Sequence, residues 1–133
     1  MAKKPIVLIV AAGRSERTNS YVPKPYMELG GKPLLVHVLE KFMHHPSIGG
    51  VRVVIRREDM PLYKKATFGL TLFPVVIGGA SRQESVRLGL ESIAHVQPSH
   101  VLVHDAARPV VSDALIQRVV DGLLQHEAVI PAV

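Results

Sequence analysis

The sequence predicts an α/β protein with a Rossmann-like fold: an open, mainly parallel sheet with helices on both faces. Two observations predict this class. Short apolar runs rich in β-branched residues alternate with longer segments whose apolar residues recur every three to four positions. The first run, Ile6 to Val10, has no polar face, which is typical of a central parallel strand that is covered on both sides.

Each element is predicted from its local pattern. Pro33 fits the first turn of a helix, and the apolar residues that follow it recur at helical spacing. Gly69 is expected to end a second helix, and Ser112 is a suitable N-cap for the last one. In chain order the expected strands are 6–10, 51–55, 72–77, 101–103 and 128–133, and the expected helices are 33–45, 58–68, 81–93 and 112–125.

The composition limits the possible classes of protein. With 133 residues, 47% of them hydrophobic, residues 1–133 are expected to form one domain or part of one. The longest apolar run is strand-sized, well below the roughly 20 residues of a membrane-spanning helix. No signal-peptide layout precedes it, and the chain has no cysteine. We therefore expect a cytoplasmic protein without a membrane partner.

The positive charge is concentrated near the amino terminus. The formal net charge is +5, and residues 1–32 hold six of the sixteen Lys and Arg residues against two acids. This distribution predicts a local anion site. Three Phe, three Tyr and no Trp are too few for base-stacking platforms, so no nucleic-acid partner is expected.

The segment after the first strand is the predicted anion site, because ligands of open α/β sheets lie beyond the carboxyl ends of the strands. Three small residues there allow backbone N–H groups to approach a phosphate or a base closely. Three cations follow that are placed to neutralise a polyphosphate. The small residues are Ala11, Ala12 and Gly13, and the cations are Arg14, Arg17 and Lys24. Neither the G-x-G-x-x-G pattern nor the Walker pattern is present.

Two further segments follow strands of the same predicted sheet. In residues 78–85, Gly79 lies in a turn, Ser81 and Glu84 have the spacing of a capping box, and the Ser85 hydroxyl is expected to face the ligand. After the fourth strand, Asp105 is placed to ligate a divalent ion that bridges phosphate oxygens. The alternative for Asp105 is a structural role in capping a turn.

Several motifs together resemble one enzyme family. They are Ala11-Ala12-Gly13 with Arg17, Pro23-Lys24-x-Tyr26, Gly31-Lys32-Pro33-Leu34-Leu35, Gly78-Gly79-x-x-Arg82-x-x-Ser85-Val86-x-x-Gly89-Leu90 and Val101-Leu102-Val103-His104-Asp105-Ala106-Ala107-Arg108-Pro109. The chain is similar over its whole length to the 2-C-methyl-D-erythritol 4-phosphate cytidylyltransferases, and especially to bifunctional members that carry a fused cyclodiphosphate synthase domain. The His104 to Pro109 block is the most specific of these motifs.

The resemblance implies a nucleotidyltransferase domain that uses CTP, methylerythritol phosphate and Mg²⁺ in isoprenoid precursor biosynthesis. By residue match, Arg17 and Lys24 would stabilise charge at the α-phosphorus, and Asp105 would hold the metal. The matched nucleotide-binding residues are Ala11, Ala12, Gly13, Arg14, Gly79, Ser85, Asp105 and Ala106. A related sugar-phosphate or molybdopterin nucleotidyltransferase is the alternative within enzymes.

Some features depart from the family pattern. Ser15 replaces a glycine of the first turn, Pro25 removes a backbone donor beside Lys24, and Ala80 stands where some relatives have a carboxylate. The chain stops within an apolar segment, residues 128–133, so we expect a truncated product that lacks the family's dimer arm. The resemblance implies a homodimer, but residues 1–133 do not include the arm that would form it. The alternative from a different class of function is a nucleotide-binding module without catalytic activity.

Overall fold

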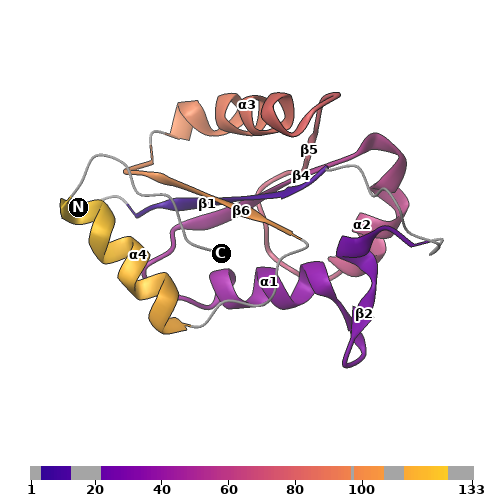
Figure 1. Cartoon of the computed structure of the whole chain (residues 1–133), viewed down its shortest axis with the longest axis horizontal. Helices are drawn as coiled ribbons and strands as arrows, with labels where there is room; N and C mark the ends of the chain where they lie inside the picture. Colours follow the sequence, from indigo (N-terminus) through magenta and orange to yellow (C-terminus); the bar gives the residue numbers. More distant parts are fainter. Residues whose placement is uncertain (1–3, 13–21, 97, 107–112, 126–133) are drawn as a thin grey trace.

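A parallel sheet lies between two layers of helices in the computed structural model, which describes residues 4–12, 22–96, 98–106 and 113–125 (Figure 1). The strands are β1 (Ile6–Ala11), β2 (Glu28–Leu29), β3 (Lys32–Pro33), β4 (Gly50–Ile55), β5 (Val76–Ile77) and β6 (Val101–Asp105). The α-helices are α1 (Leu34–Met43), α2 (Met60–Ala66), α3 (Arg82–Ile93) and α4 (Asp113–Gln125), and the 3-10 helices are η1 (Lys24–Tyr26), η2 (Arg57–Asp59) and η3 (Ala94–Val96).

Strand β1 is central in the sheet, whose order is β5-β4-β1-β6. It pairs in parallel with β4, from Ile6 opposite Gly50, and in parallel with β6, from Ile6 opposite Val101. All six residues of β1 are buried, as the absence of a polar face in the sequence predicts. The expected open parallel sheet with helices on both faces is therefore confirmed.

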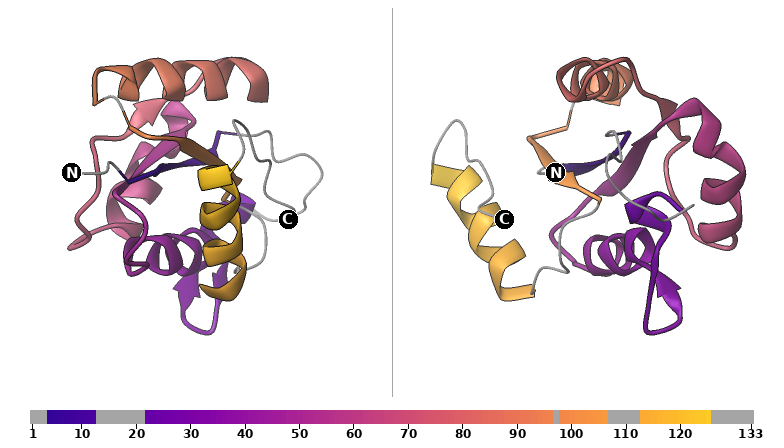
Figure 2. Two further views of the ribbon diagram at one scale, coloured as in Figure 1. Left: turned by 90° about the vertical axis from the view of Figure 1, so that its left-hand side faces the viewer. Right: turned by 45° about the vertical axis from the view of Figure 1, so that its right-hand side comes forward.

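The two faces of the sheet are covered by different helices. Helix α3 covers one face, while α1 and α4 lie on the other side (Figures 1 and 2). Against α3 the packing is close: a Cβ added at Gly89 would lie 2.7 Å from the Leu8 methyl carbons. On the opposite face, Val7 and Ile9 share a hydrophobic cluster with Leu35 and Leu39 of α1. Burial of these apolar side chains is the main stabilisation of both layers.

Two local predictions differ from the structure. The expected strand over residues 72–77 is reduced to β5, because Pro74 has no N–H to donate to a neighbouring strand. The hairpin of β2 and β3 was not predicted, since each of its strands has only two residues. Its turn is Gly30-Gly31, and both glycines have positive φ, 65° and 86°. That conformation suits a two-residue hairpin and favours glycine at both positions.

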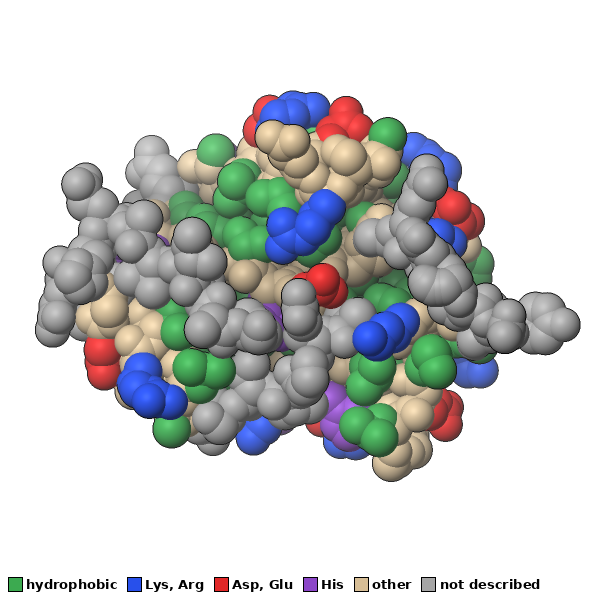
Figure 3. Space-filling model, in the orientation of Figure 1, with side chains coloured by type: hydrophobic (Ala, Val, Ile, Leu, Met, Phe, Trp, Pro, Cys, Tyr) green, Lys and Arg blue, Asp and Glu red, His purple; other side chains and the backbone are tan. Residues whose placement is uncertain are grey.

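The remaining expected helices are confirmed where the structure describes them. The segment predicted over 58–68 consists of η2 and α2, and Gly69 follows with a φ of 86° that ends it. The expected strand 128–133 and the N-cap Ser112 lie outside the described residues. Within the described ranges, no helix is long and apolar enough to cross a membrane. Acidic and basic side chains are interspersed on the face seen in Figure 3.

Candidate active site

Residues predicted to bind a nucleotide meet at the carboxyl end of the sheet. Ala11 is the last residue of β1, and Ala12 approaches Gly78, which follows β5. A Cβ added at Gly78 would lie 2.8 Å from the Ala12 Cβ and 2.5 Å from the Ser85 Oγ. The Gly78 N–H donates to the Ile55 carbonyl over 2.8 Å, which continues the sheet pairing into the turn. The structure thus brings Ala12, Gly78 and Ser85 together, but the fully buried Ser85 hydroxyl faces the Gly79 N–H of the turn rather than open space.

The amino end of α3 is held by side-chain hydrogen bonds. Ser81 is the N-cap and its Oγ accepts from the Glu84 N–H at 3.0 Å, as predicted. The Glu84 carboxylate accepts from the Ala80 N–H at 2.6 Å, so its partner precedes the cap residue and differs from that of a standard capping box. Fully buried Ser85 accepts from the Gly79 N–H at 3.1 Å. These bonds fix the turn at residues 78–81 against the helix.

Asp105 ends β6 at the same end of the sheet. Its partner in the register is Val10 of β1, and the Ala106 N–H donates to the Val10 carbonyl at 2.9 Å. The neighbouring His104 is buried on the opposite face, where its ring packs edge-on against Phe42 at 5.3 Å between centroids. Strand alternation therefore turns partly buried Asp105 toward the face that α3 covers.

Lys24 lies in the short 3-10 helix η1, and its side chain is exposed. This turn lies beside α2, at the end of the sheet where β1 and β4 end (Figure 1). Pro25 occupies the first turn of η1, where a backbone N–H has no partner within the helix in any case. The donor that Pro25 removes is therefore not needed for the local structure. Met27 closes the turn by donating to the Lys24 carbonyl at 3.1 Å.

Some predicted site residues are outside the described part of the chain: Gly13, Arg14, Arg17 and Arg108. Their roles stay predictions. For a metal, the described residues hold no group of three or more His, Cys, Asp or Glu arranged as a binding site. A single carboxylate at Asp105 nevertheless fits Mg²⁺, which commonly uses one or two protein carboxylates together with substrate phosphates and water.

Sequence reasoning missed a buried polar cluster behind η1. Tyr26 is 5% exposed and Asp59 only 4% exposed. The Asp59 carboxylate pairs with Arg56, with 3.2 Å between Oδ2 and Nε. Burial raises the pKa of Asp59, and the adjacent Arg56 charge only partly opposes that shift. Burial also raises the pKa of Tyr26, and the Asp59 charge adds to the shift.

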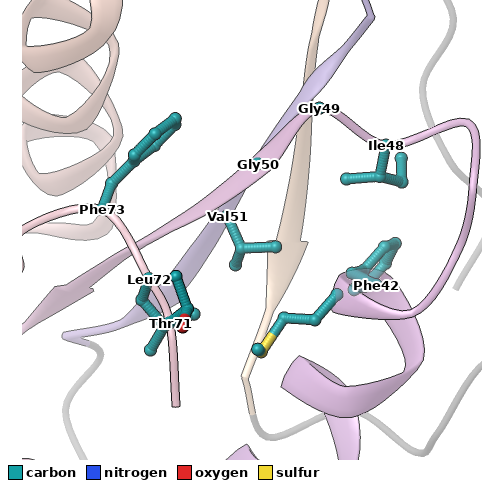
Figure 4. A pocket seen from close by; sticks show the side chains of 9 residues that line it. Phe42, Ile48, Gly49, Gly50, Val51, Thr71, Leu72 and Phe73 are labelled. Carbon is teal, nitrogen blue, oxygen red and sulfur yellow. The ribbon is translucent and has the colours of Figure 1, made fainter.

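A cavity of about 340 Å³ lies at the opposite, amino end of the sheet (Figure 4). Its lining comes from the end of α1, the start of β4 and the segment before β5, and includes Phe42, Ile48, Val51 and Leu72. These side chains are apolar, so this cavity lacks the cations and carboxylate that a triphosphate requires. Of the predicted site residues, Ala11, Ala12, Gly79, Ser85, Asp105 and Ala106, which the structure describes, lie at the other end of the strands.

The comparisons with known proteins decide the family. Residues 6–133 match the family model for 2-C-methyl-D-erythritol 4-phosphate cytidylyltransferase. The chain belongs to this family. The sugar-phosphate and molybdopterin alternatives are thereby set aside.

The relatives of this cytidylyltransferase-family chain are longer than the chain itself. It is 52% identical over 130 residues to the bifunctional enzyme IspD/IspF of Rhodospirillum rubrum. The aligned region covers 97% of this chain and 34% of that relative. The crystal structure of a 4-diphosphocytidyl-2C-methyl-D-erythritol synthase superposes with a TM-score of 0.74 and 31% identity, covering 90% of this chain and 54% of the other. Bifunctional IspDF from Campylobacter jejuni superposes with a TM-score of 0.73 and 25% identity, covering 92% and 31%.

Proposed function

We propose that this protein transfers the cytidylyl group of CTP to 2-C-methyl-D-erythritol 4-phosphate with release of pyrophosphate. One observation carries the proposal: in a chain of the cytidylyltransferase family, the described residues that directly follow β1, β5 and β6, which are Ala12, Gly78 and Ala106, lie at the same end of the parallel sheet. The names of its relatives support the choice of substrates.

The reaction needs positioning and charge neutralisation more than a protein nucleophile. An oxygen of the methylerythritol phosphate attacks the α-phosphorus of CTP, a new P–O bond forms, and the bond from that phosphorus to the bridging oxygen breaks. Pyrophosphate leaves with that electron pair. In this scheme Lys24 and Arg17 neutralise charge that builds up on the phosphate oxygens.

The nucleotide rests, in this proposal, on the turn that follows β5. Gly79 and Gly78 leave no room for side chains there, because added Cβ atoms would overlap Glu84 and Ser85 respectively. The turn is therefore closely packed against the first turn of α3. Ser85 and Glu84 hold the turn in place before the ligand arrives, which reduces the ordering cost of binding.

Asp105 is the proposed ligand for Mg²⁺, from a strand end that faces the same space. When bound, Mg²⁺ supplies charge stabilisation to the phosphate oxygens. The Asp105 carboxylate is positioned by strand pairing with β1 rather than by a mobile loop. That backbone placement keeps the acid fixed relative to the end of β1.

The experiment is a pyrophosphate-release assay with CTP, methylerythritol phosphate and Mg²⁺, together with calorimetric titrations of CTP, UTP, ATP and GTP. We expect release that depends on both substrates and tighter binding of CTP than of the other nucleotides. Binding of CTP without release supports a nucleotide-binding module instead. Absence of both binding and release contradicts the proposal.

A further inference from the structure

The turn between β5 and α3 uses its backbone N–H groups within the protein. A turn that binds phosphate has to offer such groups to the ligand instead. Here three consecutive N–H groups already have acceptors. The bonds run from Gly78 to the Ile55 carbonyl at 2.8 Å, from Gly79 to the Ser85 Oγ at 3.1 Å and from Ala80 to the Glu84 Oε1 at 2.6 Å.

Glu84 supplies the one charged acceptor among these three. Its side chain is 43% exposed, whereas Ser85 is fully buried. Solvent and dissolved ions can therefore reach the bond to Glu84 but not the bond to the buried hydroxyl. The Ala80 N–H is thus the donor of this turn for which a phosphate group would have to compete with a carboxylate of the protein itself.

Gly79 gives the Glu84 carboxylate its place. A Cβ added at Gly79 would overlap three atoms of the Glu84 side chain, which are Cγ, Cδ and Oε1. The carboxylate can fold back over the turn because residue 79 has no side chain. The space beside Gly79 is therefore occupied by the protein's own anion.

Among the residues that the structure describes, Glu84 has one ion-pair partner, and that partner is shared. Arg87 lies 3.7 Å from Glu84 but only 2.7 Å from Glu91. Two acids share one guanidinium, so a negative charge remains at the amino end of α3. Glu84 lies in the first turn of this helix, where the dipole favours an anion. The chain itself fills that role, and a second anion there would be repelled.

We propose that Glu84 is a specificity-determining residue that excludes phosphate groups from the amino end of α3, because its carboxylate takes the Ala80 N–H and places a negative charge there. The inference rests on the proposed function in one respect. The triphosphate of CTP must then bind away from this turn, toward the cations that include Lys24. Glu84 directs the placement of the ligand and takes no part in the transfer itself.

The test follows the backbone amide signal of Ala80 by NMR while inorganic phosphate is added to the unchanged protein and to Glu84→Ala. In the unchanged protein this signal should show no saturable shift. In Glu84→Ala it should shift saturably, with phosphate bound at least about tenfold more tightly, because a charge-assisted bond becomes available and a repulsion is lost. A gain of binding at one amide is not what a loss of structure produces.

Glu84→Gln separates the charge from the hydrogen bond, since it keeps an oxygen acceptor and loses the charge. A gain smaller than that of Glu84→Ala is expected. Glu91→Ala is the matched control, because Glu91 is an exposed acid of the same helix that pairs with the same arginine. Absence of a saturable Ala80 shift in Glu84→Ala, or an equal shift in Glu91→Ala, would overturn the inference.

A double-mutant cycle tests the position of the carboxylate over Gly79. Gly79→Ala should lower the free energy of unfolding in the unchanged protein, because the added methyl overlaps Glu84. In the Glu84→Ala background the overlapping atoms are absent, so the loss should be much smaller. Equal losses in both backgrounds contradict that position.

The two proposals fail in different ways, because the phosphate titration requires no turnover. If the unchanged protein releases no pyrophosphate, the proposed function fails. The Ala80 signal still decides whether Glu84 keeps phosphate away from α3.

Discussion

At each end of the parallel sheet, a glycine lies so close to neighbouring groups that a Cβ would overlap them, but the neighbouring groups differ. At the carboxyl end, a Cβ added at Gly78 would meet the Ser85 hydroxyl and Ala12. At the amino end, a Cβ added at Gly50 would lie 2.7 Å from the Phe73 ring, and the Arg52 guanidinium lies 5.4 Å from the centroid of that ring. At the carboxyl end the close neighbours belong to residues of the predicted site, whereas at the amino end the neighbour is an aromatic ring outside it.

The charges at the two ends also differ. Buried Arg52 donates to the Ser92 carbonyl at 3.0 Å, near the end of α3 where the helix dipole favours a cation. Its charge is thus used to hold α3 to β4. Lys24, in contrast, is exposed, so its charge is available to a ligand. The comparison indicates that substitutions at the carboxyl end should affect binding and turnover, and those at the amino end stability alone.

Lys24→Ala should produce the largest effect. Removing one preorganised cation costs about 10²–10³ in rate, so pyrophosphate release should fall by that factor. The thermal midpoint should not change, because the side chain is exposed. Lys64→Ala, which removes an exposed lysine from α2, is the matched control and should retain full activity. Unchanged release by Lys24→Ala would remove this lysine from the mechanism.

The paired substitutions Gly78→Ala and Gly50→Ala test the comparison directly. Each added methyl enters occupied space, so each should lower the free energy of unfolding by about 1–3 kcal/mol in denaturant titrations. Only Gly78→Ala should also weaken CTP binding in calorimetry. A similar loss of CTP affinity in both variants would show that the two ends do not have separate roles.

A smaller effect is expected from Ser85→Ala. The Gly79 N–H loses its acceptor, so the free energy of unfolding should fall by about 1 kcal/mol and CTP should bind about fivefold more weakly. Ser92→Ala is the control within α3, since it removes a bond of 2.6 Å to the Gly89 carbonyl at the opposite end of the helix. That variant should lose stability to a similar extent and keep its affinity for CTP.

The smallest effect concerns alkaline pH. The folded-state pKa of Tyr26 is raised above the ordinary value of 10.0, so Tyr26 stays protonated in the folded protein while the unfolded chain ionises. This contribution to stability is fully present below pH 10 and is lost as the pH rises above it. Stability should therefore fall by about 1 kcal/mol between pH 10 and 11 for this group.

Tyr26→Phe should remove that part of the pH dependence in denaturant titrations between pH 8 and 11. Tyr63, whose pKa is also raised by burial, keeps its own contribution in this variant. An identical pH dependence in Tyr26→Phe and in the unchanged protein would contradict the assignment.

The long elements were predictable because each depends on a local apolar pattern. Strand β1 and helix α1 have the expected bounds to within about two residues. The shortened β5 depends on Pro74, whose effect on strand pairing outweighs the apolar pattern around it. The hairpin at Gly30-Gly31 was missed because two-residue strands have no periodicity, although the glycine pair is itself a hairpin signal.

The candidate site was predictable only in part. Ala12, Ser85 and Asp105 could be named as candidates because ligand sites of parallel sheets follow the strand ends. The cluster of Tyr26 and Asp59 was not, because a short charged run such as Arg56 to Asp59 is usually solvated in a folded protein. Burial of Asp59 arises from the packing of η1 and α2, which no local pattern reveals.

The position of β1 at the centre of the sheet has a consequence for biosynthesis. This wholly apolar strand is synthesised before both of its partners, which begin at Gly50 and Val101. Pairings between segments so distant in sequence form slowly, and unpaired apolar strands are prone to aggregate. The nascent chain therefore holds its most hydrophobic segment with one side open until translation has passed Asp105, which is the interval when a chaperone would matter most.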